Sequence, residues 1–399
     1  MAAATNQDFK IETIGYYKRD NDMNVTIGVR PSPLNPNYKR LLELQASGNY
    51  TKDKFINLAD PEVIDDGNIE NYFESLLNYI SIEGFGEEKP RFVTNKQLLV
   101  EIAKKPIKQP ILAFQYLGII FISFKKFENI PPKVNETLEE KLKRAKVAMA
   151  YTHGANYAHY LTKESDEQEI PEDYAKSSCK AVMKCDISIG NQKDLVLYSA
   201  EIDALDELGQ HVELKALLNG TDSNFFWKMN SCPFYWKLSF GKCKMMLIGD
   251  KTGPKELPKM ETELDEETGL FKDQKTGEVF DKRTNSSGKD YPAYSLCKIE
   301  ELKTEEIFDK MKEQKNHEKN VGIKWYEWTV EGGKNRVRRM LKEVKMKCSD
   351  QGVCFLGTEE NKTWNFEKIE DGHAEYDDAQ DFAKLVKTKM DIWKANFSN

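Results

Sequence analysis

The sequence predicts an α/β protein in which a mixed central β-sheet is flanked by helices. Short apolar runs such as residues 111–124 are typical of buried strands. Residues 69–82 and 376–397 carry apolar side chains at helical spacing, which indicates amphipathic helices. A chain of 399 residues, 39% hydrophobic and 31% charged, is long enough to bury a sizeable core.

In the first half of the chain, strands and extended connections are expected up to about residue 58, after a tail over residues 1–8. Gly118 is expected to form a turn or bulge within the strand pattern of 111–124. Thr137-Leu-Glu-Glu140 is a capping box, and it predicts a helix that runs to about Leu161. Gly154 costs that helix about 1 kcal/mol relative to alanine, which tight packing would explain.

In the second half, residues 182–189 form a short apolar stretch and residues 242–249 are predicted to be a buried strand. The aromatic segment 224–236 is predicted to be helical, with a break at Pro233. Further helices are expected over 300–319 and 376–397. Strands are expected over 322–330 and 352–356.

Residues 250–292 are polar and rich in Gly, Lys and Glu, and they include an expected exposed hairpin at 263–281 around Thr276-Gly277. Because apolar segments resume afterwards, this stretch is interpreted as an insertion. Residues 9–399 are therefore predicted to form a single domain that carries this insertion.

The chemistry is concentrated in residues 194–218, where a polar turn at Asp206–Gln210 separates two apolar strands. Glu201 and Asp203 are two residues apart, so an extended chain directs both side chains to one face. Glu213 and Lys215 repeat this spacing on the returning strand. If the two strands pair as a hairpin, three carboxylates and one ammonium group converge.

Carboxylates that lie this close raise one another's pKa unless a cation sits between them. A hard divalent ion such as Mg²⁺ or Mn²⁺ relieves the repulsion, and the lysine then polarises a phosphate or positions a water. These features predict a metal-dependent phosphodiester hydrolase. The alternative is that the charges form the wet face of an antiparallel sheet, with Lys215 in surface ion pairs.

Composition restricts the partners and the compartment. A net charge of −7 argues against a general nucleic-acid coat, so nucleic acid is expected in a local basic groove. Seven cysteines without a C-x-x-C pair argue against a zinc site or a disulfide framework. With neither a secretory signal nor an apolar span apparent, we expect a nuclear or cytoplasmic protein and no membrane partner.

Taken together and in this order, the segments resemble the DXO family of RNA 5′-end decapping enzymes and 5′–3′ exoribonucleases, over about residues 10–397. The sharpest match is Glu201-Ile-Asp203 with Glu213-Leu-Lys215, which are similar to the family's E-h-D and E-h-K elements. The supporting segments are Phe92-Val-Thr94, Gly118-Ile-Ile-Phe121, Trp236-Lys-Leu-Ser-Phe240 and Met245-Met-Leu-Ile-Gly249.

The resemblance implies a PD-(D/E)XK-like nuclease core plus a smaller antiparallel sheet. It implies Mg²⁺ or Mn²⁺ held by Glu201, Asp203, Glu213 and the main-chain carbonyl of Leu214. Glu201, Asp203, Glu213 and Lys215 would be the catalytic set. The implied substrates are RNA 5′ ends with non-methylated or defective caps, triphosphates or nicotinamide-type caps.

The sequence departs from the family pattern at three positions. Lys96 stands where the family has an arginine, so it would bind a substrate phosphate as a point charge without the bidentate fork. Ala158 replaces the glutamate of a G-x-x-x-E element, and Leu238 replaces a glutamine. Loss of one metal-ligand carboxylate predicts a weakened metal site. Whether Ala158 is a natural or an engineered residue stays open.

Three further features have a functional and a structural interpretation. His153 and His159 flank the missing glutamate as surrogate ligands, although packing or surface roles are favoured. The basic stretch 334–347 either lines an RNA path or, as we favour, is a core-packed helix with a solvated basic face. The aromatic residues within 225–236 either stack bases or, as we favour, pack in the core.

Two functions follow from the sequence. The leading one is a metal-dependent hydrolase of RNA 5′ ends, with decapping activity, exonuclease activity or both. The alternative is a catalytically impaired protein of the same fold that binds RNA ends or a nuclease partner, which Ala158 and Leu238 favour.

Overall fold

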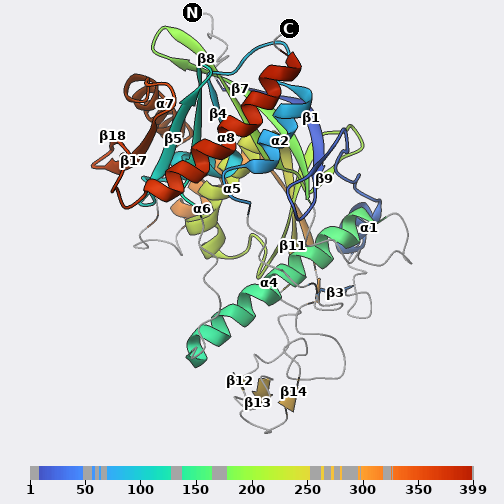
Figure 1. Ribbon diagram of the computed structural model, residues 1–399. Helices are drawn as coiled ribbons and strands as arrows, with labels where there is room; N and C mark the ends of the chain where they lie inside the picture. The colour runs from blue at the N-terminus through green and yellow to red at the C-terminus, as the bar shows by residue number, and fades with distance from the viewer. Residues whose placement is uncertain are drawn as a thin grey trace, which may run out of the picture.

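The computed structural model shows a layered α/β architecture (Figure 1). The described residues are 9–47, 56–58, 63, 70–126, 137–163, 178–251, 262–264, 271–273, 279–280, 295–296, 298–317, 325 and 327–397. The expected tail, residues 1–8, lies outside them. No helix in this described part of the chain is long and apolar enough to cross a membrane.

A nine-stranded mixed sheet forms the centre of the molecule. In spatial order its strands are β18 (Thr363–Lys368), β17 (Cys354–Glu360), β5 (Ile111–Tyr116), β6 (Ile119–Phe124), β4 (Phe92–Asn95), β8 (Gln192–Glu201), β7 (Ser178–Ile189), β1 (Lys10–Arg19) and β2 (Val25–Ile27). β4 pairs in parallel with both β6 and β8, and the other neighbours are antiparallel. The sheet therefore matches the predicted mixed central sheet.

Both faces of this sheet are buried. One face packs against α3 (Lys96–Lys104), α5 (Ser231–Gly241) and α7 (Val330–Lys347), and the other against α2 (Glu74–Glu83) and α8 (Tyr376–Phe397). Figure 1 shows α2 and α8 side by side over one face. Because helices cover both faces at the centre of the sheet, β6 is buried along its whole length, as its largely apolar sequence predicts.

A second, smaller sheet has the order β16 (Lys298–Lys303), β11 (Cys243–Asp250), β10 (His211–Leu217) and β9 (Ala204–Leu205). It packs against α1 (Asn37–Ala46) and α4 (Leu138–Thr162). The expectation of a smaller antiparallel sheet is wrong in one respect. β10 and β11 run parallel, because the η2 (Phe226–Asn230) and α5 segment carries the chain back between them.

The predicted hairpin within residues 194–218 is shorter than expected. The turn is present, since the Asp206 N–H donates to the Gln210 carbonyl at 2.9 Å, but β9 and β10 pair over only two residues each. β8 belongs to the large sheet and β10 to the small one. The chain therefore crosses between sheets directly after Glu201.

Several helix and strand predictions are confirmed, and others need correction. The capping box opens α4 at Thr137, and Gly118 adopts a positive φ in the turn between β5 and β6. Residues 298–303 form β16, and the helix predicted over 300–319 is only α6 (Ile307–Asn316), preceded by the short η3 (Thr304–Glu306). The strand predicted over 322–330 falls partly outside the described residues, and its last residue begins α7.

The polar insertion is described only in part. β12 (Thr262–Leu264), β13 (Phe271–Asp273) and β14 (Val279–Phe280) form an antiparallel group, within which β13 and β14 form a pair, as the predicted hairpin requires. The tip at Thr276-Gly277 lies outside the described residues. A further small pair joins β3 (Ile56–Asn57) to β15 (Ser295–Leu296).

Two helical glycines occupy contrasting surroundings. A Cβ on Gly333 of α7 would overlap the ring of Trp236, which is itself buried, and would approach the Ala103 carbonyl. A Cβ on Gly154 of α4 would meet none of the described residues within 4 Å. The tight packing suggested for Gly154 is therefore wrong, and Gly333 is the position where α7 requires a glycine.

Gly333→Ala is expected to lower the free energy of unfolding by about 1–3 kcal/mol, because the methyl group forces Trp236 or the backbone to shift. Gly154→Ala, the matched control, is expected to raise it by up to about 1 kcal/mol through helix propensity. Urea unfolding followed by circular dichroism measures both. Equal effects of the two changes would contradict the packing described here.

Candidate active site

The candidate site lies where two parallel strands end together. β4 and β8 pair in parallel with Asn95 opposite Ser199, so their carboxyl ends meet at one edge of the large sheet. α3 begins directly after β4, and the Asn95 side chain caps it by accepting from the Leu98 N–H at 2.8 Å. The positive end of α3 therefore faces the last residue of β8, Glu201.

A cavity of about 300 Å³ opens at this edge. Its lining includes four acidic and four basic side chains, which are Glu70, Glu201, Asp203, Glu213, Lys96, Lys180, Lys215 and Lys237. Their formal charges cancel, although the whole chain carries −7. The cavity is thus a balanced ionic site, and the alternative of a wet sheet face with surface ion pairs does not describe it.

One ammonium group joins the buried carboxylate of Glu213 to the half-buried carboxylate of Asp203. Lys215 Nζ lies 2.8 Å from Glu213 Oε1 and 3.3 Å from Asp203 Oδ2. Asp203 Oδ2 also accepts from the Leu214 N–H at 2.8 Å. Lys237 Nζ approaches Glu213 Oε1 from α5 at 2.9 Å. Glu213 is therefore in contact with two cations, whereas Asp203 shares one of them.

The two carboxylates respond in opposite directions to this arrangement. Burial raises the pKa of Asp203 and Glu213 adds to the rise by repulsion, so Lys215 offsets it only in part. Burial also opposes ionisation of Glu213, but Lys215, Lys237 and Lys96 together hold its pKa well below its usual range. Burial disfavours the Lys215 ammonium, and the surrounding carboxylates nevertheless raise its pKa. Glu213 and Lys215 are consequently charged at neutral pH.

Lys96 and Glu201 meet at the mouth of the cavity. The Lys96 side chain is buried and its Nζ donates to the Glu201 carbonyl at 2.9 Å. Glu201 itself is exposed, so its carboxylate faces solvent at the opening. Lys96 thus positions the end of β8 in addition to contributing charge to the cavity.

The opposite wall is built around Glu70, which immediately precedes the α2 region. Its carboxylate pairs with Lys180 Nζ and accepts from the Ser75 N–H at 2.8 Å and from Ser75 Oγ at 2.7 Å. Lys180 lies opposite Glu201 in the β7–β8 register. Burial alone would raise the pKa of Glu70, but Lys180 and Ser75 lower it. This pair fixes one side of the cavity.

Glu70→Gln is expected to lower the free energy of unfolding at pH 7 by about 3 kcal/mol, because it leaves Lys180 buried without its counter-ion. Since the folded-state pKa of Glu70 lies below the ordinary glutamate value of 4.5, its stabilisation is present above pH 4.5 and is lost as the pH falls below that value. The difference between wild type and variant should therefore shrink on acidification. Denaturant unfolding at pH 7 and pH 3.5 tests this, and a constant difference would contradict it.

The predicted site residues converge in large part. Glu201, Asp203, Glu213, Lys215 and Lys96 all line the cavity. Leu214 enters the site through its amide, whose bond to Asp203 the sequence did not suggest. A role for its carbonyl remains a prediction.

Of the three positions that depart from the family pattern, Lys96 lines the cavity, whereas Ala158 and Leu238 lie elsewhere, as does His153. Ala158 is half-buried against the core of the small sheet. Leu238, a residue of α5, is fully buried in the core of the large sheet. His153 is buried with its Nδ1 2.8 Å from Lys251 Nζ. Packing, the role favoured for His153, agrees with this placement.

Three charged lining residues were not found from the sequence, namely Glu70, Lys180 and Lys237. Lys237 has a signal in retrospect, because it is the single charged residue in the α5 sequence SCPFYWKLSFG. A lone charge between buried Trp236 and Leu238 requires either solvent or a partner. Glu70 and Lys180 carry no comparable local pattern.

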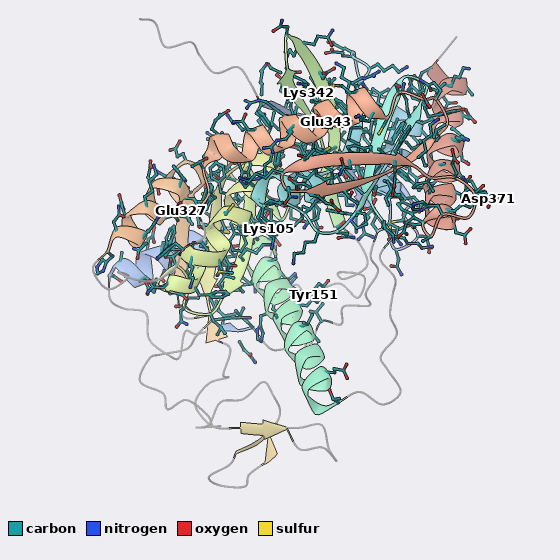
Figure 2. The ribbon with its side chains drawn as sticks, turned by 90° about the vertical axis from the view of Figure 1, so that its left-hand side faces the viewer. Lys105, Tyr151, Glu327, Lys342, Glu343 and Asp371 are labelled. Carbon is teal, nitrogen blue, oxygen red and sulfur yellow. The ribbon has the colours of Figure 1, made fainter. Side chains whose placement is uncertain are left out.

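The basic helix α7 packs as the favoured interpretation predicts. Val337, Met340, Leu341 and Val344 are fully buried, while Lys342 and Glu343 lie on the outer side of the helix (Figure 2). Arg336 caps the end of α3, with Nε 3.1 Å from the Ile102 carbonyl. Contact between this helix and RNA remains a prediction.

The aromatic residues of segment 225–236 are divided. Phe226, Trp227 and Trp236 are buried in the core, as favoured, whereas Phe225 is 63% exposed. Base stacking by Phe225 is not tested by this arrangement.

Neither a protein-family model nor a curated protein sequence matches the chain. Solved structures do. Rai1 of Candida albicans, in complex with pU5 and Mn²⁺, has a TM-score of 0.59 at 12% identity, over 97% of this chain and 100% of that chain. Rai1 of Scheffersomyces stipitis, with (3′-NADP)⁺ and calcium, has a TM-score of 0.56 at 13% identity and 97% coverage of both chains.

Dxo1 of K. lactis, in complex with manganese, has a TM-score of 0.53 at 12% identity, over 92% of this chain and 91% of that chain. The chain has the fold of the DXO family. The expected resemblance is thereby confirmed for the fold, which extends over almost the whole length of these proteins. At 11–13% identity the likeness does not transfer their ligands to this chain.

Two of these DXO-fold structures contain manganese and one contains calcium, so the donor set of this chain needs its own test. Glu201, Asp203 and Glu213 present hard carboxylate oxygens, which suit Mg²⁺ or Mn²⁺. Within the described residues, no three acidic, histidine or cysteine side chains are close enough together to form a metal-binding group. The donors therefore fit a divalent ion in kind, but Lys215 and Lys237 already neutralise Glu213.

Proposed function

We propose that this DXO-fold protein is a divalent-metal-dependent hydrolase that acts on RNA 5′ ends, by decapping, exonucleolysis or both. The observation that carries the proposal is the convergence of Glu201, Asp203, Glu213 and Lys215 in one cavity at the carboxyl ends of β4 and β8. Catalytic sites of open α/β sheets lie at such ends. A volume of about 300 Å³ suits the terminal group of a longer ligand.

The substrate's terminal phosphate fits the basic side of this cavity. The amide groups at the start of α3 and the lysines Lys96 and Lys180 provide positive charge there. Because Lys96 replaces a bidentate arginine, it holds the phosphate through charge more than through fixed geometry. The exposed carboxylate of Glu201 at the mouth faces the incoming strand.

The reaction itself is assigned to the Asp203, Glu213 and Lys215 cluster. The two carboxylates hold the Lys215 ammonium, which remains charged and stabilises negative charge that develops on the scissile phosphate. Asp203, whose pKa is raised, is suited to accept a proton from an attacking water. Glu201, Asp203 and Glu213 would be the residues to hold a divalent ion, which would require them to lie closer together than they do in the described part of the chain, and the ion would supply Lewis-acid chemistry there.

The purified protein with Mn²⁺ is expected to release product from at least one of three RNAs, which carry a 5′-triphosphate, an unmethylated cap or a nicotinamide cap. Glu213→Gln should lower the rate by at least about 100-fold, because it leaves Lys237 without a carboxylate and Lys215 with Asp203 alone. Glu207→Gln is the matched control, since Glu207 is 72% exposed in the turn before β10. Radiolabelled product analysis measures the rates.

Absence of product from all three RNAs at high enzyme concentration, both in the wild type and in Ala158→Glu, would refute the hydrolase. The second candidate is then favoured, a protein of this fold that captures RNA ends without cleaving them. The charge-balanced cavity is the observation that supports this candidate. Binding of 5′-phosphorylated RNA in preference to 5′-hydroxyl RNA, in the absence of cleavage, would identify it.

A further inference from the structure

Lys237 has a placement that neither the helix nor the core requires. Its neighbours Trp236 and Leu238 are 2% and 0% exposed and hold α5 against the large sheet. Lys237 points the other way, into the cavity, with 34% of its side chain exposed. Its position in the cavity is therefore explained by its contact with a carboxylate there and not by packing.

The contact of Lys237 is with the most buried carboxylate of the site. Its Nζ lies 2.9 Å from Glu213 Oε1, and the Glu213 side chain is 2% exposed. The same oxygen already has Lys215 Nζ at 2.8 Å, and Lys215 additionally contacts Asp203. Glu213 thus has one ammonium that also links it to Asp203 and a second that contacts no other described carboxylate in an ion pair.

A divalent ion bound at Glu213 would have two ammonium groups within a few ångströms, and like charges at that separation repel strongly in a partly buried site. Lys215 forms ion pairs with two carboxylates, so moving its ammonium group out of the cavity would break both of them. Lys237 is held by one and is one-third exposed, so its flexible stem allows the ammonium to move into solvent. Lys237 is the displaceable cation of the pair.

We infer that Lys237 is an internal counter-ion which competes with divalent metal for Glu213, so that metal binds only when Lys237 withdraws from the cavity. This inference rests on the proposed metal-dependent function of the same site. It makes Lys237 a residue that sets metal affinity and not a catalytic residue. Removing its charge leaves the cavity with four carboxylates against three lysines, which favours a cation.

The test is Mn²⁺ titration by isothermal calorimetry, without RNA, of the full chain and four variants. Lys237→Gln should bind Mn²⁺ about tenfold or more tightly than the wild type, because one repelling charge is removed. Lys237→Arg keeps the charge and should resemble the wild type. Lys244→Gln makes the same charge change at an exposed residue of β11 outside the cavity, and it should also resemble the wild type.

Equal Mn²⁺ affinity of Lys237→Gln and wild type, including undetectable binding in both, would overturn the inference. So would an equal gain in Lys244→Gln, because the effect would then come from net charge alone. Adding Glu213→Gln to Lys237→Gln should abolish the gain. The calorimetric titration is independent of RNA turnover. If Lys237→Gln binds Mn²⁺ more tightly and the separate assay shows no RNA hydrolysis, the proposed function is refuted and the inference stands.

Discussion

The ion pairs of Lys215 with Asp203 and Glu213 are the constraint on which the site depends. Two carboxylates enter a space with little water, and burial penalises the charge on both. A single ammonium between them makes the arrangement tolerable, and a second one from Lys237 favours the ionised form of Glu213 over that of Asp203. The resulting asymmetry lowers the pKa of Glu213 and leaves that of Asp203 raised, although the two groups are chemically similar.

The architecture explains why these groups meet. β8 ends at Glu201 in the large sheet, and the chain then moves into the small sheet, where β10 carries Glu213 and Lys215. Asp203 lies at this crossing and accepts the Leu214 amide, which ties the crossing segment to β10. The start of α3 and the Glu70–Lys180 pair close the remaining sides. The site therefore sits at the junction of two sheets, on rigid elements.

Charge balance distinguishes this cavity from an open acidic cluster. Four lysines match four carboxylates, so the folded protein needs no external ion to offset the repulsion among the acids. That balance stabilises the apo cavity and at the same time raises the cost of admitting another cation. Of the four cavity lysines, Lys237 on α5 is the most exposed, which is why we infer that it is the one that leaves when a metal ion binds.

The sequence by itself determined the elements and the local part of the site. Continuous apolar runs predicted strands that are buried on both faces, and the capping box predicted the start of α4. Glu201, Asp203, Glu213 and Lys215 were predictable together because they lie within fifteen residues of one another, and their spacing marks them.

Only the tertiary structure decided the rest. The hairpin expected around residues 206–210 pairs over just two positions, because the strands beside it belong to different sheets. Three cavity residues come from separate parts of the chain, namely Glu70, Lys180 and Lys237. Their positions depend on which strand pairs with β8 and on which side of α5 packs against the sheet. Periodicity encodes which face of an element is buried, but it does not encode which element lies next to it.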